Sequence, residues 1–284
     1  MKLGVTSYSF MKYVRQVRCD YAALCDIAKD MGFEGVEFIN LDMLFDDPIG
    51  DVLEAAHGIR GHCEKIGLEI TAYTVSADLL ADDAGKELAN IRSCVDVAAA
   101  LGAKVLRHDA AWAPRSVFGY GYKDAIAEIV PLIREITEYA EAKGVKTCTE
   151  NHGRFFQDPE RVRELIEAVN HPNYGWLVDI GNFMGVDADI VDAVQTAAPY
   201  AFHVHIKDNL FKPGSGIAPE GWDVTGRGDY LRATAPGHGV VPIAQCINIL
   251  RESGYDGYIS LEFEGWEDTL QAIKSGYAYL RKLL

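Results

Sequence analysis

The chain has 284 residues, 49% of them hydrophobic, which is enough to bury a large core in a single domain. Its 27 basic residues stand against 42 acidic ones, and a formal charge of -15 disfavours the phosphate-neutralising surface that nucleic acid requires. No run reaches the ~20 apolar residues of a membrane span, and the six cysteines show neither a CxxC pair nor zinc-site spacing. We therefore expect a cytoplasmic protein with reduced thiols and with no membrane or nucleic-acid partner.

Short β-rich runs alternate with amphipathic stretches along the whole chain. The expected strands are Leu3–Ser7, Gly35–Ile39, Leu68–Thr74, Ala103–His108, Val145–Glu150, Tyr174–Asp179, Phe202–Lys207 and Tyr258–Phe263. Apolar residues recur at helical spacing between them, for example from Leu88 to Ala98 and from Ile126 to Ile136. Glycines 32, 67 and 102 each end a helical stretch and lie 35 residues apart, which is the size of one βα unit.

Eight such units predict the fold. Strands that alternate with helices form a parallel sheet covered on its faces, and eight repeats close it into a barrel. We predict one (β/α)8 TIM barrel domain over residues 1–284, with extended loops near 110–123 and 209–240. A doubly wound open sheet is the alternative, but no glycine-rich phosphate turn follows the first strand.

Polar side chains occupy the carboxyl ends of the predicted strands, where a barrel directs them toward a shared cavity. Glu150, Asp179, His205 and Glu262 end four strands that follow one another in sequence. Three converging carboxylates repel one another unless a cation neutralises them. An oxygen-rich set with one imidazole suits Mn²⁺ best, or Mg²⁺ or Co²⁺. We therefore predict that these four residues bind one divalent metal ion.

Other residues at the strand ends supply candidates for catalysis and substrate binding. Strand alternation places His152 on the same face as Glu150, and His203 and Lys207 on the same face as His205. We predict Glu150, Glu262 and His152 as the catalytic groups. Substrate contacts are predicted from Lys207, His108, Glu37, Tyr73 and Asn182. For Glu37, His108 and Lys207 a supporting role fits as well, and His203 fits the core better than a ligand position.

At these residues the sequence resembles the xylose-isomerase-like barrel superfamily, over nearly the whole chain. The segments that carry the resemblance are Thr149-Glu150-Asn151-His152-Gly153, Leu177 to Asn182, His203 to Asp208 and Leu261-Glu262. The resemblance implies one Mn²⁺- or Mg²⁺-like ion on the four predicted ligands. In the epimerase branch it implies that the two glutamates are the acid/base pair. Asn182 stands where that branch has a histidine, and the Glu-Asn-His-Gly and His-x-Lys-Asp segments also resemble the inosose-dehydratase branch.

The function that follows is a metal-dependent sugar isomerase or epimerase, which removes a proton next to a carbonyl and passes through an enediolate. A keto-sugar or inosose dehydratase is the first alternative, with His152 or Lys207 as the acid for the leaving hydroxyl. A barrel that binds a sugar without turning it over is the second. The expected partner is a small sugar or polyol, and the absence of a Lys/Arg cluster at the last two strand ends favours an unphosphorylated one. The oligomeric state stays open, a homo-oligomer included.

Overall fold

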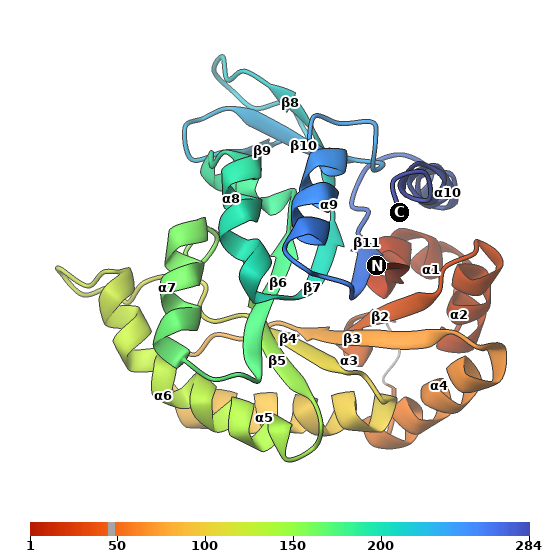
Figure 1. Ribbon diagram of the computed structural model, residues 1–284, viewed down its shortest axis with the longest axis horizontal. Coiled ribbons are helices and arrows are strands. Elements are labelled where there is room, and N and C mark those ends of the chain that lie inside the picture. The colour runs from red at the N-terminus through yellow and green to blue at the C-terminus, as the bar shows by residue number, and fades with distance from the viewer. Residues whose placement is uncertain (45–48) are drawn as a thin grey trace.

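All eight predicted strands form, and they close into one parallel barrel with helices around it (Figure 1). The structure is a computed structural model and describes residues 1–44 and 49–284. The order around the barrel is β1-β11-β7-β6-β5-β4-β3-β2, and pairing of β1 with both β2 and β11 closes it. The barrel strands are β1 (Lys2–Thr6), β2 (Gly35–Ile39), β3 (Glu69–Val75), β4 (Val105–His108), β5 (Lys146–Glu150), β6 (Tyr174–Asp179), β7 (Ala201–Ile206) and β11 (Tyr258–Leu261).

Helices follow the strands and cover the outside of the barrel (Figure 1). The long ones are α2 (Tyr21–Asp30), α4 (Val52–Ile66), α5 (Ala84–Leu101), α6 (Tyr122–Glu141), α7 (Pro159–Val169), α8 (Ile190–Ala197), α9 (Ile243–Glu252) and α10 (Thr269–Leu280). Shorter pieces are α1 (Met11–Val17), α3 (Leu41–Leu44) and the 3-10 turns η1 (Ser7–Phe10), η2 (Asn182–Val186) and η3 (Ala198–Tyr200). This single-domain (β/α)8 barrel is the predicted fold.

Local sequence signals set the helix ends. Gly67 and Gly102 cap α4 and α5 in the left-handed conformation, with φ of 66° and 75°, which glycine adopts without a Cβ clash. At the other end of a helix, the Asp158 side chain accepts hydrogen bonds from two backbone N–H groups at the start of α7, and Pro159 is the first helical residue. These signals fix where each helix stops and the next strand begins.

Two apolar layers hold the barrel together. The larger one lies between strands and helices, and a small separate cluster of Ala72, Val105, Cys148 and Leu177 takes one residue from each of β3 to β6. The cluster lies inside the barrel, because its four residues come from four adjacent strands and do not contact the outer core. Because side chains alternate along a strand, Arg107 also points inward and His108 points outward.

The segment predicted as a long loop over 209–240 contains a sheet of its own. Strands β8 (Asp208–Lys212), β9 (Asp223–Val224) and β10 (Tyr230–Thr234) pair antiparallel in the order β8-β10-β9, at the top of Figure 1. The segment after β4 has no such order, and α6 begins at Tyr122. Both segments leave from the carboxyl ends of barrel strands. Among the described residues, no helix combines the length and apolar character that crossing a membrane needs.

Candidate metal centre

Four adjacent barrel strands bring the predicted metal ligands together. Glu150 ends β5, Asp179 ends β6, His205 lies near the end of β7 and Glu262 directly follows β11. In the barrel these strands are neighbours in the order β5-β6-β7-β11. All four side chains are buried, and one ligand atom from each lies within 4.8 Å of the others. The sequence prediction that these residues meet is therefore matched by their positions.

Asn151 joins the ends of β5 and β6. Its Nδ2 donates to the Asp179 backbone oxygen at 2.7 Å, and its Oδ1 accepts from the Asp179 N–H and from Trp176 Nε1, both at 3.0 Å. The side chain therefore fixes Asp179 relative to Glu150. Asp179 Oδ1 in turn accepts from the backbone N–H groups of Gly181 and Asn182.

Two buried atoms at the centre of the cluster lack a hydrogen bond. Within the described part of the chain, neither His205 Nδ1 nor Asp179 Oδ2 has a hydrogen-bond partner. His205 Nδ1 lies 3.5 Å from Glu262 Oε2 and 4.0 Å from Glu150 Oε1. The three carboxylates that gather here repel one another, and a bound cation removes that repulsion. The donor set, three carboxylates and one imidazole, thus fits a divalent metal ion.

Lys207 is a buried cation beside this cluster. Its Nζ lies 2.9 Å from Glu262, 3.3 Å from Glu264 and 3.4 Å from Asp179. Although burial opposes ionisation, Lys207 and His205 hold the pKa of Glu262 below its usual range. Burial raises the pKa of Asp179 to about 7, against the opposing charge of Lys207. The carboxylates of the cluster therefore differ in how firmly they hold a negative charge.

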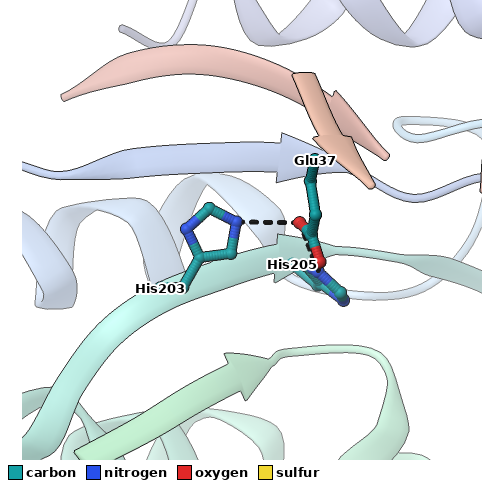
Figure 2. Close-up of side chains that lie close together, drawn as sticks. All are labelled: Glu37, His203 and His205. Atoms are coloured by element: carbon teal, nitrogen blue, oxygen red, sulfur yellow. Dashed lines mark hydrogen bonds and ion pairs between the residues drawn. The ribbon is translucent and has the colours of Figure 1, made fainter. Parts of the chain in front are cut away.

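Glu37 lies beneath His205 inside the barrel, where no solvent reaches it. Figure 2 shows its carboxylate next to both histidines of β7. His203 Nε2 lies 2.8 Å from Glu37 Oε2, and His205 Nε2 lies 2.9 Å from both carboxylate oxygens. Although burial opposes ionisation, the two histidines hold the pKa of Glu37 well below its usual range. The carboxylate is therefore an acceptor, and His205 Nε2 carries the hydrogen.

A cavity of about 270 Å³ opens next to the cluster. Its polar lining includes Glu150, Glu262, Glu264, His152 and Lys207, and aromatic walls come from Tyr8 and Trp112. The Trp112 and His152 rings pack edge to face, with centroids 5.6 Å apart. All three predicted catalytic groups therefore line one cavity, and two of them, Glu150 and Glu262, are also predicted metal ligands.

The structure separates the predicted substrate-binding residues into two sets. Lys207 lines the cavity, and Asn182 bridges from it to the cluster, since it accepts from Lys207 Nζ at 3.2 Å and donates to Glu150 at 2.9 Å. Glu37, Tyr73 and His108 are buried and are not part of the cavity lining. His108 points outward from β4 and Tyr73 accepts from the Leu41 N–H. The predicted substrate contact of these three side chains has no support from their positions.

Arg107 is the functional candidate that sequence reasoning missed. It is buried, lines the cavity, and its Nη2 lies 2.7 Å from both Glu150 Oε2 and Asp109 Oδ1. Asp109 Oδ1 also lies 3.2 Å from His152 Nδ1. Arg107 and Asp109 are two apart and share a face, so the alternation that grouped Glu150 with His152 would have found this pair too.

Comparison with known proteins assigns the chain to a protein family. A family model described as a xylose isomerase-like TIM barrel matches residues 25–283. An uncharacterised protein from Methanocaldococcus jannaschii is 30% identical over 49% of this chain, and an inosose isomerase from Halalkalibacterium halodurans is 28% identical over 47%. The matched region spans 44% of the length of each relative.

Solved structures with the same fold cover the whole chain. A probable 3-DHS dehydratase from Bacillus anthracis superposes with a TM-score of 0.74 at 22% identity, covering 99% of both chains. An L-ribulose 3-epimerase has a TM-score of 0.75 at 19% identity and covers 100% of this chain and 94% of its own. An IOLI protein with a bound zinc atom has a TM-score of 0.76 at 17% identity and covers 100% and 98%. At these identities the likeness shows the fold alone.

Proposed function

This chain belongs to the xylose isomerase-like TIM barrel family, and we propose that it is a divalent-metal-dependent isomerase or epimerase of a sugar or polyol. The reaction begins with removal of a proton from the carbon next to a carbonyl, which gives an enediolate. Return of the proton to the neighbouring carbon completes an isomerisation, and return to the opposite face completes an epimerisation. An inosose isomerase among the relatives and an epimerase among the structural neighbours support this choice.

Glu150, Asp179, His205 and Glu262 would hold the metal ion, with Mn²⁺ as the first candidate and Mg²⁺ or Co²⁺ as alternatives. Among the described residues, His205 Nδ1 and Asp179 Oδ2 are buried without a hydrogen bond, which supports this assignment. The zinc atom in one structural neighbour shows that this fold accommodates a divalent ion in that protein. When bound, such an ion supplies Lewis-acid stabilisation of negative charge on substrate oxygens.

The observation that carries the proposal is the placement of Glu150 and Glu262 at the two ends of the four-strand row. Their carboxylates flank Asp179 and His205 and line the same cavity. Glu150 is held by Arg107 and Asn182, whereas Glu262 is held by Lys207. Two carboxylates with different partners can divide the roles of proton acceptor and proton donor.

The cations of the cavity favour a neutral substrate. Among the described residues that line it, the permanently charged cations are Arg107 and Lys207. Arg107 is paired with Asp109 and Glu150, and Lys207 with Glu262 and Glu264. A phosphate group would have to compete with these carboxylates for the same donors. We therefore propose an unphosphorylated substrate.

Dehydration of a keto-sugar or inosose is the second candidate, and the pairing of His152 with Asp109 favours it. A carboxylate within 3.2 Å of Nδ1 orients the imidazole, and the ring lines the cavity where a leaving hydroxyl would sit. Loss of water requires a general acid at that place, whereas isomerisation expels no hydroxyl and needs no acid for a leaving group. The dehydratase among the structural neighbours shares the fold.

One assay separates the candidates. The protein is loaded with Mn²⁺ and incubated in D₂O with a panel of ketoses, keto-inositols and 3-keto-glycosides, and products are followed by NMR and mass spectrometry. Deuterium uptake without loss of water supports the isomerase or epimerase. Loss of water identifies a dehydratase. Saturable binding with neither change identifies a sugar-binding barrel and ends the enzyme proposal.

A further inference from the structure

Three buried polar side chains form a second cluster directly beneath the candidate metal centre. Glu37 from β2 meets His203 and His205 from β7 across the barrel interior (Figure 2). One ligand atom from each of the three lies within 4.8 Å of the others, and none of them has appreciable exposure. His205 belongs to both clusters, with Nε2 toward Glu37 and Nδ1 toward Glu150 and Glu262.

We propose that Glu37 is a positioning residue that fixes the tautomer and the ring orientation of His205, and thereby sets the affinity of the centre for its metal ion. An ionised carboxylate only accepts hydrogen bonds, so His205 must present N–H at Nε2. In a neutral imidazole that leaves the lone pair on Nδ1, the atom that faces Glu150 and Glu262 of the centre. The inference rests on the proposed metal site. It adds that the hydrogen bond to Glu37 leaves Nδ1 of His205 free to bind the ion.

The surroundings of Glu37 hold its carboxylate in place. Thr74 Oγ1 donates to Oε1 at 2.5 Å, and His203 Nε2 lies 2.8 Å from Oε2 and 2.9 Å from Ser260 Oγ. These two donors to Glu37 come from β3 and β7, so the barrel itself positions the carboxylate, and Ser260 of β11 contacts only His203 in this set. Histidines that bind metals commonly donate their other N–H to a carboxylate, and loss of that partner typically weakens metal binding ~10- to 100-fold.

A second metal ion between Glu37, His203 and His205 is the competing interpretation. The distances of 2.8 to 2.9 Å between these atoms are those of N–H···O hydrogen bonds, and Thr74 and Ser260 complete the set of partners. One proton on each Nε2 satisfies every contact, whereas an ion there would bind three protein ligands, none of which lines the cavity. The two interpretations predict one and two ions per chain.

The test is Glu37→Gln, measured by Mn²⁺ titration calorimetry and by ¹⁵N NMR of the histidine side chains with Zn²⁺ as the diamagnetic probe. The amide oxygen can accept from one histidine, but the amide NH₂ then faces the other N–H, so one imidazole must change tautomer or turn. We expect 10- to 100-fold weaker Mn²⁺ binding and loss of the Nε2–H signal pattern of His205. Glu37→Asp keeps an acceptor and should recover part of the affinity.

Ser260→Ala is the matched control, because it removes a partner of His203 in the same buried layer and leaves the link between Glu37 and His205. Its Mn²⁺ affinity should stay within about twofold of the parent. Equal affinity and an unchanged His205 tautomer in Glu37→Gln would overturn the inference while the metal site itself stands. Failure of the parent protein to bind any divalent ion would instead remove the proposed function. If Glu37→Gln does not fold, the Zn²⁺-loaded parent protein is the test. N–H on Nδ1 of His205 in place of Nε2, or two ions per chain, would contradict the role of Glu37.

Discussion

Arg107 and Glu150 form a buried ion pair, with Nη2 and Oε2 2.7 Å apart and both side chains almost fully enclosed. The guanidinium also reaches Asp109 at 2.7 Å and donates to the Val75 backbone oxygen at 3.1 Å. One cation thus joins the ends of β3, β4 and β5 next to the cavity. Its charge balances two buried carboxylates, whose other contacts include Asn182 for Glu150 and His152 for Asp109.

We expect Arg107→Met to destabilise the fold, because the buried carboxylates of Asp109 and Glu150 lose the guanidinium that balances their charge. Removal of one partner from a buried ion pair costs about 3 to 5 kcal/mol. Denaturant unfolding followed by circular dichroism measures the loss. Arg163→Met is the control, since Arg163 pairs with Glu160 and Glu167 on the surface of α7 and should cost less than about 1 kcal/mol. Equal effects of the two substitutions would contradict the role given to Arg107.

Replacement of either flanking glutamate by its amide should abolish proton exchange without unfolding the protein. Glu150→Gln and Glu262→Gln keep the shape of the side chain and remove the charge that accepts a proton. A positioned acid or base contributes about 10²- to 10⁴-fold to the rate, so solvent deuterium uptake should fall by at least 10²-fold. Glu138→Gln, at an exposed position of α6, should leave the rate unchanged. Retained exchange in both glutamate variants would move the acid/base role elsewhere.

Metal binding should stabilise the fold through the four-residue centre. An ion that binds only the folded state at 100 times its dissociation constant adds about 2.7 kcal/mol to the free energy of unfolding. We expect Mn²⁺ to raise the denaturation midpoint and a chelator to reverse the effect. Asp179→Asn should lose this response. Its amide oxygen can still accept from the N–H groups of Gly181 and Asn182, so without metal we expect it to unfold no earlier than the parent.

The sequence predicts the quartet well because its logic needs only strand order and alternation. Parallel strands end at one edge of the barrel, so Glu150, Asp179, His205 and Glu262 meet whatever the details of the loops. Each of them also ends or follows an apolar run that is easy to find. The same reasoning cannot tell how deep inside the barrel a side chain lies. Glu37 is on the inner face but sits below His205, after a register shift between β2 and β3.

His108 shows a second limit. All four residues of β4 are buried, so the pattern of polar and apolar residues does not tell which face is the inner one. A histidine at a strand end suggests a substrate contact, yet the inward position belongs to Arg107 and Asp109. The sheet of β8 to β10 was missed for another reason. Its short strands lie among glycines and prolines and carry polar and apolar residues without the long apolar run of a barrel strand.

Asp208, which follows Lys207 in the motif at the end of β7, has a structural task that can be measured. Its Oδ1 accepts from the N–H groups of Asn209 and Val241, and its Oδ2 from those of Gly237 and Gly239. Four charge-assisted bonds to one buried carboxylate anchor the segment that returns from the small sheet to α9. We expect Asp208→Asn to lower the free energy of unfolding by about 3 kcal/mol, because the amide NH₂ faces two backbone donors that lose their acceptor.

Asp229→Asn is the matched control for this substitution. Asp229 Oδ1 accepts from one backbone N–H, that of Gly214, in a more exposed part of the same region. The change should cost less than about 1 kcal/mol. Mn²⁺ affinity separates a structural role from a ligand role. Asp208→Asn should keep the affinity of the parent under conditions where it is folded, since its oxygens are engaged by the backbone and lie outside the four-residue centre. A loss of affinity as large as that of Asp179→Asn would make Asp208 part of the metal centre.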